Sequence, residues 1–412
     1  MSPSGAWAVD WAINSTQSES VEFNNNLFLN SMVAGGVFGS YSTITANATA
    51  RTPDSEFDFN GSINYRKYFG PGIEGNPSES LAGTMRGHYE TKEDTNGDKN
   101  YLDVSWNRQN TSFALLGELG VTTPVNGDIE TTKIGGGIVR SLTNLDTLTL
   151  SARSSFTDYD PAASGTAFTD TTANATWRHK VSSVASLNVS SDAEYLDYSN
   201  ATSTSANTRE WLFRETAGVD LTLSPRLSLR GNGGIVYVVA NGTGSSAILP
   251  FSTGSVSSTN GSASGSGYIA NILLTYKLLK NTTLMLSAVR TIAPSLIGSL
   301  TQTSTLHAGL SQIVDSHSSL SFSSDISQIS YSGTTSEIFS ASVAYSYMLT
   351  HEWSAQLSYR YLHRLASAGT ASSAVTIDPV TGIPVITGTG PASSNSILVV
   401  VSRSVSILPD GY

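Results

Sequence analysis

Apolar and polar residues alternate along most of the chain, with the period of two that a half-buried β-strand gives. In residues 57–66, one set of alternate positions holds Phe, Phe, Gly, Ile and Tyr, and the other holds Asp, Asn, Ser, Asn and Arg. The same alternation recurs in residues 7–14, 113–121, 227–239, 268–278 and 353–361. Residues 21–36 fit a strand and a loop equally well. The pattern predicts an all-β chain whose strands have one apolar face and one polar face.

Alternation alone does not decide between water and lipid as the solvent outside the sheet, because a soluble β-sandwich alternates too. Three features favour lipid. The predicted strands reach about ten residues, the length needed to cross a bilayer at a tilt. Their polar faces carry charged and amide side chains that suit a wet lumen. Aromatic residues such as Tyr65, Tyr68 and Trp353 lie toward strand ends, where membrane interfaces place them. A soluble array of β-sandwiches is the alternative.

The connections between strands predict how the strands are joined. Proline has no N–H to donate to a sheet, and all 13 prolines fall between the predicted strands. Short polar turns, each followed by a new alternating segment, occur in residues 141–150, 181–189, 223–229, 278–286, 313–322 and 348–357. Their spacing of roughly forty residues corresponds to two membrane strands, a short turn and a longer loop.

The sequence therefore predicts a single domain over residues 1–412. Its fold class is an all-β, transmembrane, antiparallel up-and-down β-barrel of about 16 to 20 strands, with about 18 as the best estimate. Short turns are expected on the periplasmic side. Longer extracellular loops are expected at 241–267, 366–395 and the charged stretch 91–100.

Composition narrows the class of protein further. Charged residues make up 13% of the chain, whereas about 25% is usual in soluble domains. The absence of cysteine excludes disulfides and Cys-zinc sites, and a net charge of −10 argues against a nucleic-acid partner. No apolar run reaches the roughly 18 residues of a spanning helix. No signal peptide precedes the first strand, so we expect the mature form of a bacterial outer-membrane protein.

Two hairpins, at residues 221–230 (LTLSPRLSLR) and 345–359 (YSYMLTHEWSAQLSY), carry a family resemblance. With them, the chain resembles the β-barrel porins encoded beside exopolysaccharide or exosortase systems, over most of its length. The resemblance implies an outer-membrane barrel that passes a polysaccharide or small solutes. The surroundings would be lipid and lipopolysaccharide, the partners a polysaccharide and periplasmic export components, and there would be no cofactor. One departure is that the last predicted strand, 395–407, does not end on an aromatic residue; Tyr412 follows only after Leu-Pro-Asp-Gly.

One loop has the composition of a cation site. Side-chain oxygens stand at alternate positions in Asp94, Asn96, Asp98 and Asn100, as they do in calcium loops. Lys99 replaces the expected glycine, so a solvated Asn-Gly turn is the competing interpretation. The six histidines form no HExxH motif, and there is no GxSxG motif, so neither zinc nor hydrolase chemistry has a recognisable site.

The polar faces supply the candidate functional residues. If the apolar faces contact lipid, the charged side chains that line the lumen are Asp58, Arg66, Arg86, His88, Glu90, Asp103, Glu118, Arg178, Asp192, Glu194, Arg214, Arg230, Arg360 and Arg364. Opposite charges facing one another across a constriction would create the transverse field with which pores sort solutes. Charges that only pair with one another in a filled barrel are the alternative. We expect a non-enzymatic channel; a non-conducting structural or adhesive barrel is the second hypothesis, and an outer-membrane hydrolase the third.

Overall fold

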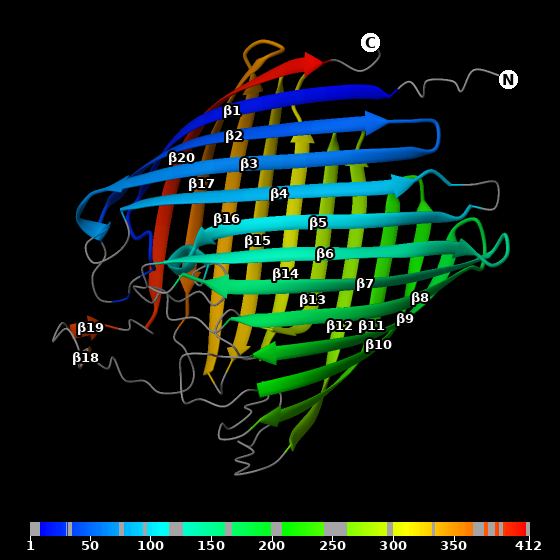
Figure 1. The fold of residues 1–412 in the computed structure, drawn as a ribbon. Coiled ribbons are helices and arrows are strands. Elements are labelled where there is room, and N and C mark those ends of the chain that lie inside the picture. The colour runs from blue at the N-terminus through cyan, green and yellow to red at the C-terminus, as the bar shows by residue number, and fades with distance from the viewer. Residues whose placement is uncertain are drawn as a thin grey trace, which may run out of the picture.

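Almost every residue that the structure describes belongs to a long β-strand (Figure 1). The computed structural model describes residues 9–29, 31, 35–73, 78–93, 97–114, 127–160, 167–198, 208–242, 262–294, 300–331, 334–365, 375–377, 384–386 and 390–408. The strands are β1 (Asp10–Asn24), β2 (Val37–Arg51), β3 (Ser55–Phe69), β4 (Glu79–Thr91), β5 (Lys99–Asn110), β6 (Asp128–Ser141), β7 (Asp146–Tyr159), β8 (Phe168–Lys180), β9 (Ala185–Tyr198), β10 (Thr208–Ser224), β11 (Leu227–Gly242), β12 (Ser262–Leu279), β13 (Thr282–Pro294), β14 (Leu300–Ile313), β15 (Ser318–Tyr331), β16 (Thr334–Met348), β17 (Trp353–Arg364), β18 (Val375–Ile377), β19 (Pro384–Ile386) and β20 (Ala392–Leu408). A short 3-10 helix, η1 (Pro71–Ile73), follows β3. No helix in the described part of the chain is long and apolar enough to cross a membrane.

The long strands form a meander that closes on itself. Each of them pairs in antiparallel fashion with its neighbours along the chain, and β20 pairs with both β17 and β1. This pairing closes an 18-stranded sheet into a barrel and leaves it without an open edge. The short strands β18 and β19 pair with each other in a separate hairpin. The predicted fold class and the estimate of 18 strands are confirmed.

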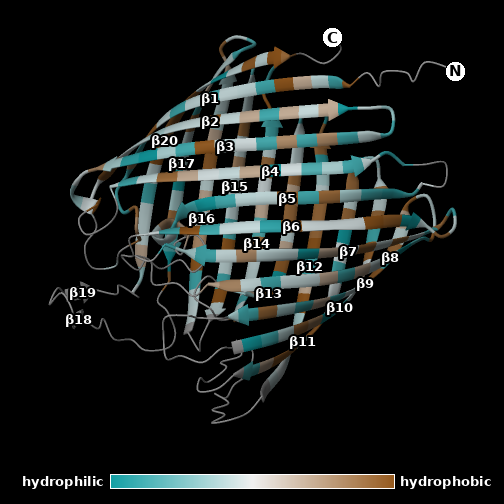
Figure 2. Ribbon diagram, viewed as in Figure 1, coloured by the Kyte–Doolittle hydropathy of each residue, from teal (hydrophilic) through white to brown (hydrophobic). Residues whose placement is uncertain are grey.

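The alternation in the sequence separates the outside of the barrel from the inside. Ile63 on β3 is 54% exposed on the outer face, and its cross-strand partner Ile44 on β2 is 56% exposed. Ser62 points the other way, and its hydroxyl lies 2.8 Å from that of Thr84. Figure 2 shows hydrophobic and hydrophilic residues alternating along the strands. So much exposed apolar surface is unfavourable in water but not in hydrocarbon, and it is the outer surface of a membrane-spanning barrel.

Short turns and long connections lie at opposite ends of the barrel. The turns at 52–54, 142–145, 181–184 and 225–226 lie at the end where β1 starts and β20 finishes (Figure 1). Residues 92–98 join β4 to β5 at this same end. Their prediction as an extracellular loop is therefore wrong if the short turns are periplasmic. Because each strand reverses the direction of the chain, the number of preceding strands determines the end at which a connection lies, and its length does not.

The strand predicted at 113–121 is wrong where the structure describes it. β5 ends at Asn110, and residues 111–114 form one helical turn. Asn110 caps this turn, because its Oδ1 accepts a hydrogen bond from the N–H of Ser112 at 3.1 Å. Residues 115–126 lie outside the described residues. In the ambiguous segment 21–36, β1 continues to Asn24 and a turn follows.

One carboxylate holds the turn between β14 and β15. Asp315 Oδ1 accepts hydrogen bonds from the backbone N–H groups of His317 at 2.7 Å and Ser318 at 2.8 Å. The bond from His317 contributes most to lowering the pKa of Asp315, because it favours the ionised form. With a lowered folded-state pKa, the carboxylate stabilises the turn above the unfolded value of about 3.9, and this contribution is lost as the pH falls through the folded value.

We therefore expect Asp315→Ala to lower the urea midpoint of unfolding at about pH 6 and to lower it by less at about pH 2, because the contribution of the ionised carboxylate is lost as the pH falls through its folded-state pKa. The two proteins would be compared in the same detergent micelles. A destabilisation of equal size at both pH values would contradict a role for the ionised carboxylate.

Candidate functional site in the barrel lumen

The inner face of the barrel has two chemically different parts. The first, which we call the charged wall, is the inner face of β3 to β11 and carries most of the charged side chains that point inward. The second, the hydroxyl wall, is the inner face of β14 to β17, β20, β1 and β2 and consists largely of Ser and Thr. Hydroxyls there bond to one another across strands, as in Ser18 with Ser402 at 2.9 Å and Ser323 with Ser342 at 2.7 Å. Both walls are polar, but only one carries a dense array of charge.

A first network on the charged wall brings together four of the predicted lumen residues. Asp103 on β5 accepts a hydrogen bond from Arg86 Nη2 at 3.1 Å, and its Oδ1 lies 3.0 Å from Nδ1 of His88. The next carboxylate along β4, Glu90, pairs with Lys99 at 3.1 Å. The arginine is 67% exposed at its side chain, so these pairs hold charge in place and contribute about 1 kcal/mol or less each to stability.

A second network spans β8 to β11. Asp220 on β10 accepts a hydrogen bond at 2.8 Å from Arg178 on β8 and another at 2.8 Å from Arg230 on β11. Both arginines were predicted to face the lumen, and they meet on one carboxylate. The side chains of these arginines are 50% and 68% exposed, so they remain accessible to solvent in the lumen.

A buried ion pair joins β9 and β10 on the charged wall. Glu194 on β9 pairs with Arg214 on β10, and their side chains are only 4% and 17% exposed. Arg214 Nη2 also donates a hydrogen bond to the carbonyl oxygen of Ile292, at 3.1 Å. Asp170 on β8, with 9% of its side chain exposed, lies 3.7 Å from Arg153 on β7. Removing either partner of the Glu194 pair would leave a buried charge uncompensated.

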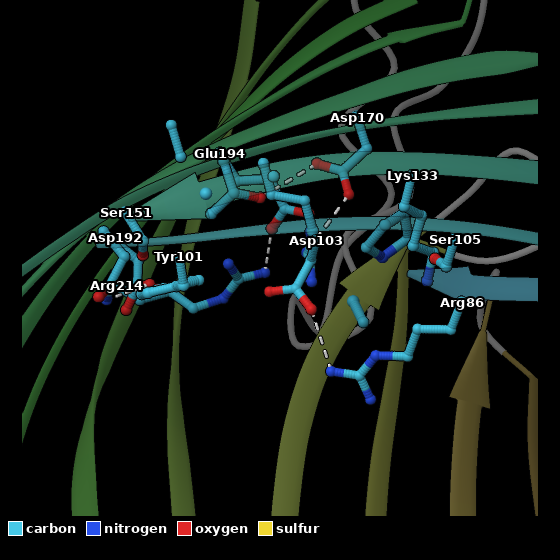
Figure 3. Close-up of a pocket in the computed structure, with 18 residues that line it drawn as sticks. Arg86, Tyr101, Asp103, Ser105, Lys133, Ser151, Asp170, Asp192, Glu194 and Arg214 are labelled. Carbon is cyan, nitrogen blue, oxygen red and sulfur yellow. Dashed lines mark hydrogen bonds and ion pairs between the residues drawn. The ribbon is translucent and has the colours of Figure 1, made fainter. Parts of the chain in front are cut away.

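These groups border a cavity of about 780 Å³ (Figure 3). Its lining comes from seven consecutive strands, β4 to β10, and from the end of β13. The charged residues in the lining are the bases Arg86, Lys133, Arg153 and Arg214 and the acids Asp103, Asp170, Asp192 and Glu194. The labelled side chains in Figure 3 converge on one space from several strands. Because bases and acids are equal in number, neither sign of charge dominates the cavity.

The β13–β14 hairpin leans into the lumen at its far end. We call the ends of these strands, residues 292–294 and 300–302, the hairpin tip. Ile292 and Leu300 are each 2% exposed. They belong to one buried cluster with Phe168, Leu196, Tyr198, Leu212, Val236 and Val238. These partners lie on β8 to β11, two to five strands away around the barrel. The hairpin tip therefore covers part of the charged wall, and burying each of its large side chains contributes about 1.5 to 3 kcal/mol.

An aromatic cluster covers the other edge of the charged wall. The guanidinium of Arg66 lies 5.8 Å from the ring centroid of Tyr41 and 5.9 Å from that of Phe113. The ring of Tyr68 stacks on Phe113, with 5.3 Å between centroids, and Phe28 lies 5.6 Å from Phe113. The cluster thus joins the connection after β1 and the helical turn after β5 to the wall. Aromatic surface is therefore present near the lumen as well as on the lipid side.

The other predicted lumen residues are held by other contacts, although Asp192 also lines the cavity. Asp58 accepts a hydrogen bond from a threonine hydroxyl at 2.7 Å, and Asp192 accepts one from an asparagine amide at 2.8 Å. Arg360 lies between two serines of the neighbouring strands. Arg364 is 1% exposed and donates to the carbonyl of Gly390 at 2.9 Å, so its role is to hold a connection. Glu118 lies outside the described residues.

The calcium candidate is described only in part. Asp98 Oδ1 accepts a hydrogen bond from the N–H of Ser141 at 2.9 Å, and Asn100 Oδ1 accepts one from Arg140 at 3.3 Å. Asp94 and Asn96 lie outside the described residues. Across the part of the chain that the structure describes, no three His, Asp or Glu side chains are grouped to hold a metal ion.

Sequence reasoning missed several charged residues of the charged wall, among them Lys99, Lys133, Arg153, Asp170, Glu210 and Asp220. The signal was available, because each alternates with an outward-facing neighbour; Lys133, for example, precedes Ile134, which is 48% exposed. In β6 to β8, however, Gly, Ser and Thr occupy both faces, and the phase of the alternation is hard to read there.

The charge networks on the wall join strands that are adjacent or close around the barrel. The charges therefore pair with one another along the wall.

Comparison with known proteins supports the architecture. No protein-family model matches the sequence, and no curated protein matches it. Among solved structures, the chain is similar to the FrpB iron transporter from Neisseria meningitidis (F3-3 variant), with a TM-score of 0.50 and 8% identity over 96% of this chain and 81% of that one. It is also similar to the ferric-catecholate import receptor Fiu from E. coli K12 in its open form, with a TM-score of 0.48 and 11% identity over the same shares. At such identities the likeness shows the fold alone, which is that of an outer-membrane β-barrel.

Proposed function

We propose that this protein is an outer-membrane channel that passes solutes or an exopolysaccharide through a polar lumen of mixed charge. The observation that carries the proposal is the closed barrel with a charged wall, a hydroxyl wall and a cavity of about 780 Å³. Charged groups are costly to bury without partners, and several arginines of the wall are half-exposed, which fits a water-filled interior. The barrel fold shared with the FrpB iron transporter is consistent with transport.

The chemistry of the lumen suggests which solutes would pass. Four bases and four acids line the cavity, so we expect weak selectivity between anions and cations. Hydroxyls offer both donors and acceptors to uncharged, hydroxylated molecules. The resemblance of the hairpins 221–230 and 345–359 to exopolysaccharide-associated porins adds a polysaccharide to these candidates. Such a role would involve periplasmic export components as partners, with lipid and lipopolysaccharide around the barrel.

A liposome-swelling assay tests passage of uncharged solutes. Liposomes containing the refolded barrel are expected to swell in an arabinose solution, more slowly in a disaccharide, and not at all in a long dextran, because entry falls with solute size. Liposomes with heat-denatured protein are the control. Swelling no faster than in this control, for the smallest sugar, would contradict an open channel.

A non-conducting structural or adhesive barrel is the second candidate, and one observation favours it. The hairpin tip and the aromatic cluster both pack against the inner wall and narrow the lumen. If the tip closes the path, the wild type would not pass sugars, whereas the double variant Ile292→Asn, Leu300→Asn would, because it loses the apolar contacts that seat the tip. Equal permeability of the two proteins would assign the tip no role in closure.

A further inference from the structure

A second cavity lies on the inner face of β2 to β5, against the aromatic cluster. Its volume is about 320 Å³, at the lower end of the range of roughly 300 to 1,000 Å³ found for small-molecule sites. It shares no lining residue with the cavity of about 780 Å³. Among its described lining residues Arg66 is the only charged one, and most of the others carry amides or hydroxyls. The cavity therefore has the size and polarity of a site for one small, hydroxylated solute.

Two amide side chains in this cavity are available to a ligand. Asn107 and Gln109 lie two residues apart on β5, so they point to the same face of the sheet. Both are half-buried, and their side chains make no hydrogen bond within the part of the chain that the structure describes. Each side-chain amide offers two donors and one acceptor oxygen. A solute with several hydroxyl groups can therefore bond to both without breaking a contact of the folded protein.

The arginine at the cavity is held in position by its neighbours. Arg66 Nε donates a hydrogen bond to Asn64 Oδ1 at 2.5 Å, and Asn64 Nδ2 donates in turn to the hydroxyl of Thr43. The ring centroids of Tyr41 and Phe113 lie 5.8 and 5.9 Å from the guanidinium. The bond to Asn64 does not use the two Nη groups, which carry donors that match a carboxylate.

The acids around Arg66 are engaged elsewhere. Glu22 on β1 accepts a hydrogen bond from the Tyr41 hydroxyl. Farther along the wall, Asp103 on β5 pairs with Arg86 on β4. In the described part of the chain, neither acid lines the cavity or forms an ion pair with Arg66. A negative charge on a ligand would therefore meet a cation that has no acid bonded to it.

We propose that this cavity binds one unit of an acidic saccharide, a pyranose that carries a carboxylate as a uronic acid does. The carboxylate pairs with Arg66, the ring hydroxyls bond to the amides of Asn107 and Gln109, and the C–H face of the sugar lies against Phe113. A zwitterionic amino acid fits less well, because the described lining offers no acid to its ammonium group. An inorganic anion would leave both amides unused. The inference rests on the proposed passage of a saccharide, to which it adds a binding step on the wall.

Saturation-transfer NMR titration of the purified barrel in detergent tests this site without relying on transport. The probes are sodium glucuronate, glucose and sodium acetate, compared at equal ionic strength. The wild type is expected to bind glucuronate at least about tenfold more tightly than glucose or acetate, because only glucuronate engages the guanidinium and the amides together. Arg66→Gln is expected to bind glucuronate no better than glucose. The matched control is Arg86→Gln, which removes an arginine from the larger cavity and is expected to bind glucuronate as the wild type does.

Each outcome decides for or against the acidic saccharide. A wild type that binds glucuronate no more tightly than glucose or acetate overturns the proposal, and so does an equal effect of Arg66→Gln and Arg86→Gln. If Arg66→Gln does not fold, the double variant Asn107→Ala, Gln109→Ala takes its place. Its glucuronate binding is expected to weaken about tenfold, and unchanged binding counts against the site.

The assay also separates this site from the channel hypothesis. A barrel that binds glucuronate but never conducts would contradict only the channel. A barrel that conducts but does not bind glucuronate would contradict only the site.

Discussion

Ile63→Lys is expected to destabilise the folded barrel by about 2 to 4 kcal/mol, the cost of a charge at the lipid-facing midplane of a membrane strand. Ile63 stands near the middle of β3 (Ser55–Phe69) and is 54% exposed on the outer face. Its cross-strand neighbours are Ile44 and Gly83, which offer no counter-charge. Equilibrium unfolding in urea from lipid vesicles would measure the loss, as a lower midpoint at unchanged slope.

The matched control is Ser62→Lys, one residue away on the same strand. Ser62 points to the lumen, where a lysine head group meets water, so its cost is expected to stay within about 0.5 kcal/mol. The difference between the stability losses at these two adjacent positions reports the difference between the solvents on the two faces of the sheet. Equal effects at Ile63 and Ser62 would contradict the assignment of the outer face to lipid.

Arg214→Ala is expected to have a still larger effect, a loss of about 3 to 5 kcal/mol, because it leaves Glu194 buried without its counter-charge. The pair is 17% and 4% exposed at its side chains, so solvent screens it little. The substitution also removes the hydrogen bond at 3.1 Å to the carbonyl of Ile292, which links the charged wall to the hairpin tip. Unfolding in urea measures the free energy, and proteolysis of the hairpin would report whether the tip is released.

Two further variants separate the effect of losing a counter-charge from the effect of shortening a side chain. Arg230→Ala removes an arginine that is 68% exposed and pairs with Asp220, so a loss below about 1 kcal/mol is expected. Arg214→Met combined with Glu194→Leu replaces the buried pair by apolar groups of similar size and is expected to recover most of the stability. If the double variant is as unstable as Arg214→Ala, the cost comes from lost packing and not from an unpaired carboxylate.

Much of the fold can be predicted from the sequence, because each strand of a barrel faces two different solvents. In β3 the phase of the alternation assigns Ile63 to the outside and Ser62 to the inside, and the structure agrees. The strand count follows from the regular hairpins. The end of the barrel at which residues 92–98 lie depends on whether an odd or an even number of strands precedes them. The charge and length of that segment carry no information about it.

The contacts inside the barrel are harder to predict from the sequence, because they join distant strands. Ile292 has the same phase as Leu286, which is 39% exposed on the outside, so alternation assigns it to lipid. The structure buries Ile292 against β9 to β11, since the end of the hairpin bends inward. Likewise, the phase of a strand places Glu194 and Arg214 inside, but it does not show that they pair with each other, or that Oε2 of Glu210 has no hydrogen-bond partner among the described residues. Those facts depend on register between strands, which the sequence alone does not give.

Single-channel recording in a planar lipid bilayer tests the central claim, a water-filled path through the barrel, most directly. Purified wild-type protein is predicted to insert with steady conductance steps of uniform size and a small reversal potential in a salt gradient, because bases and acids in the cavity lining are equal in number. Addition of an oligosaccharide should interrupt the current if the path also admits sugars. A folded, inserted barrel that never conducts at any voltage would contradict the account.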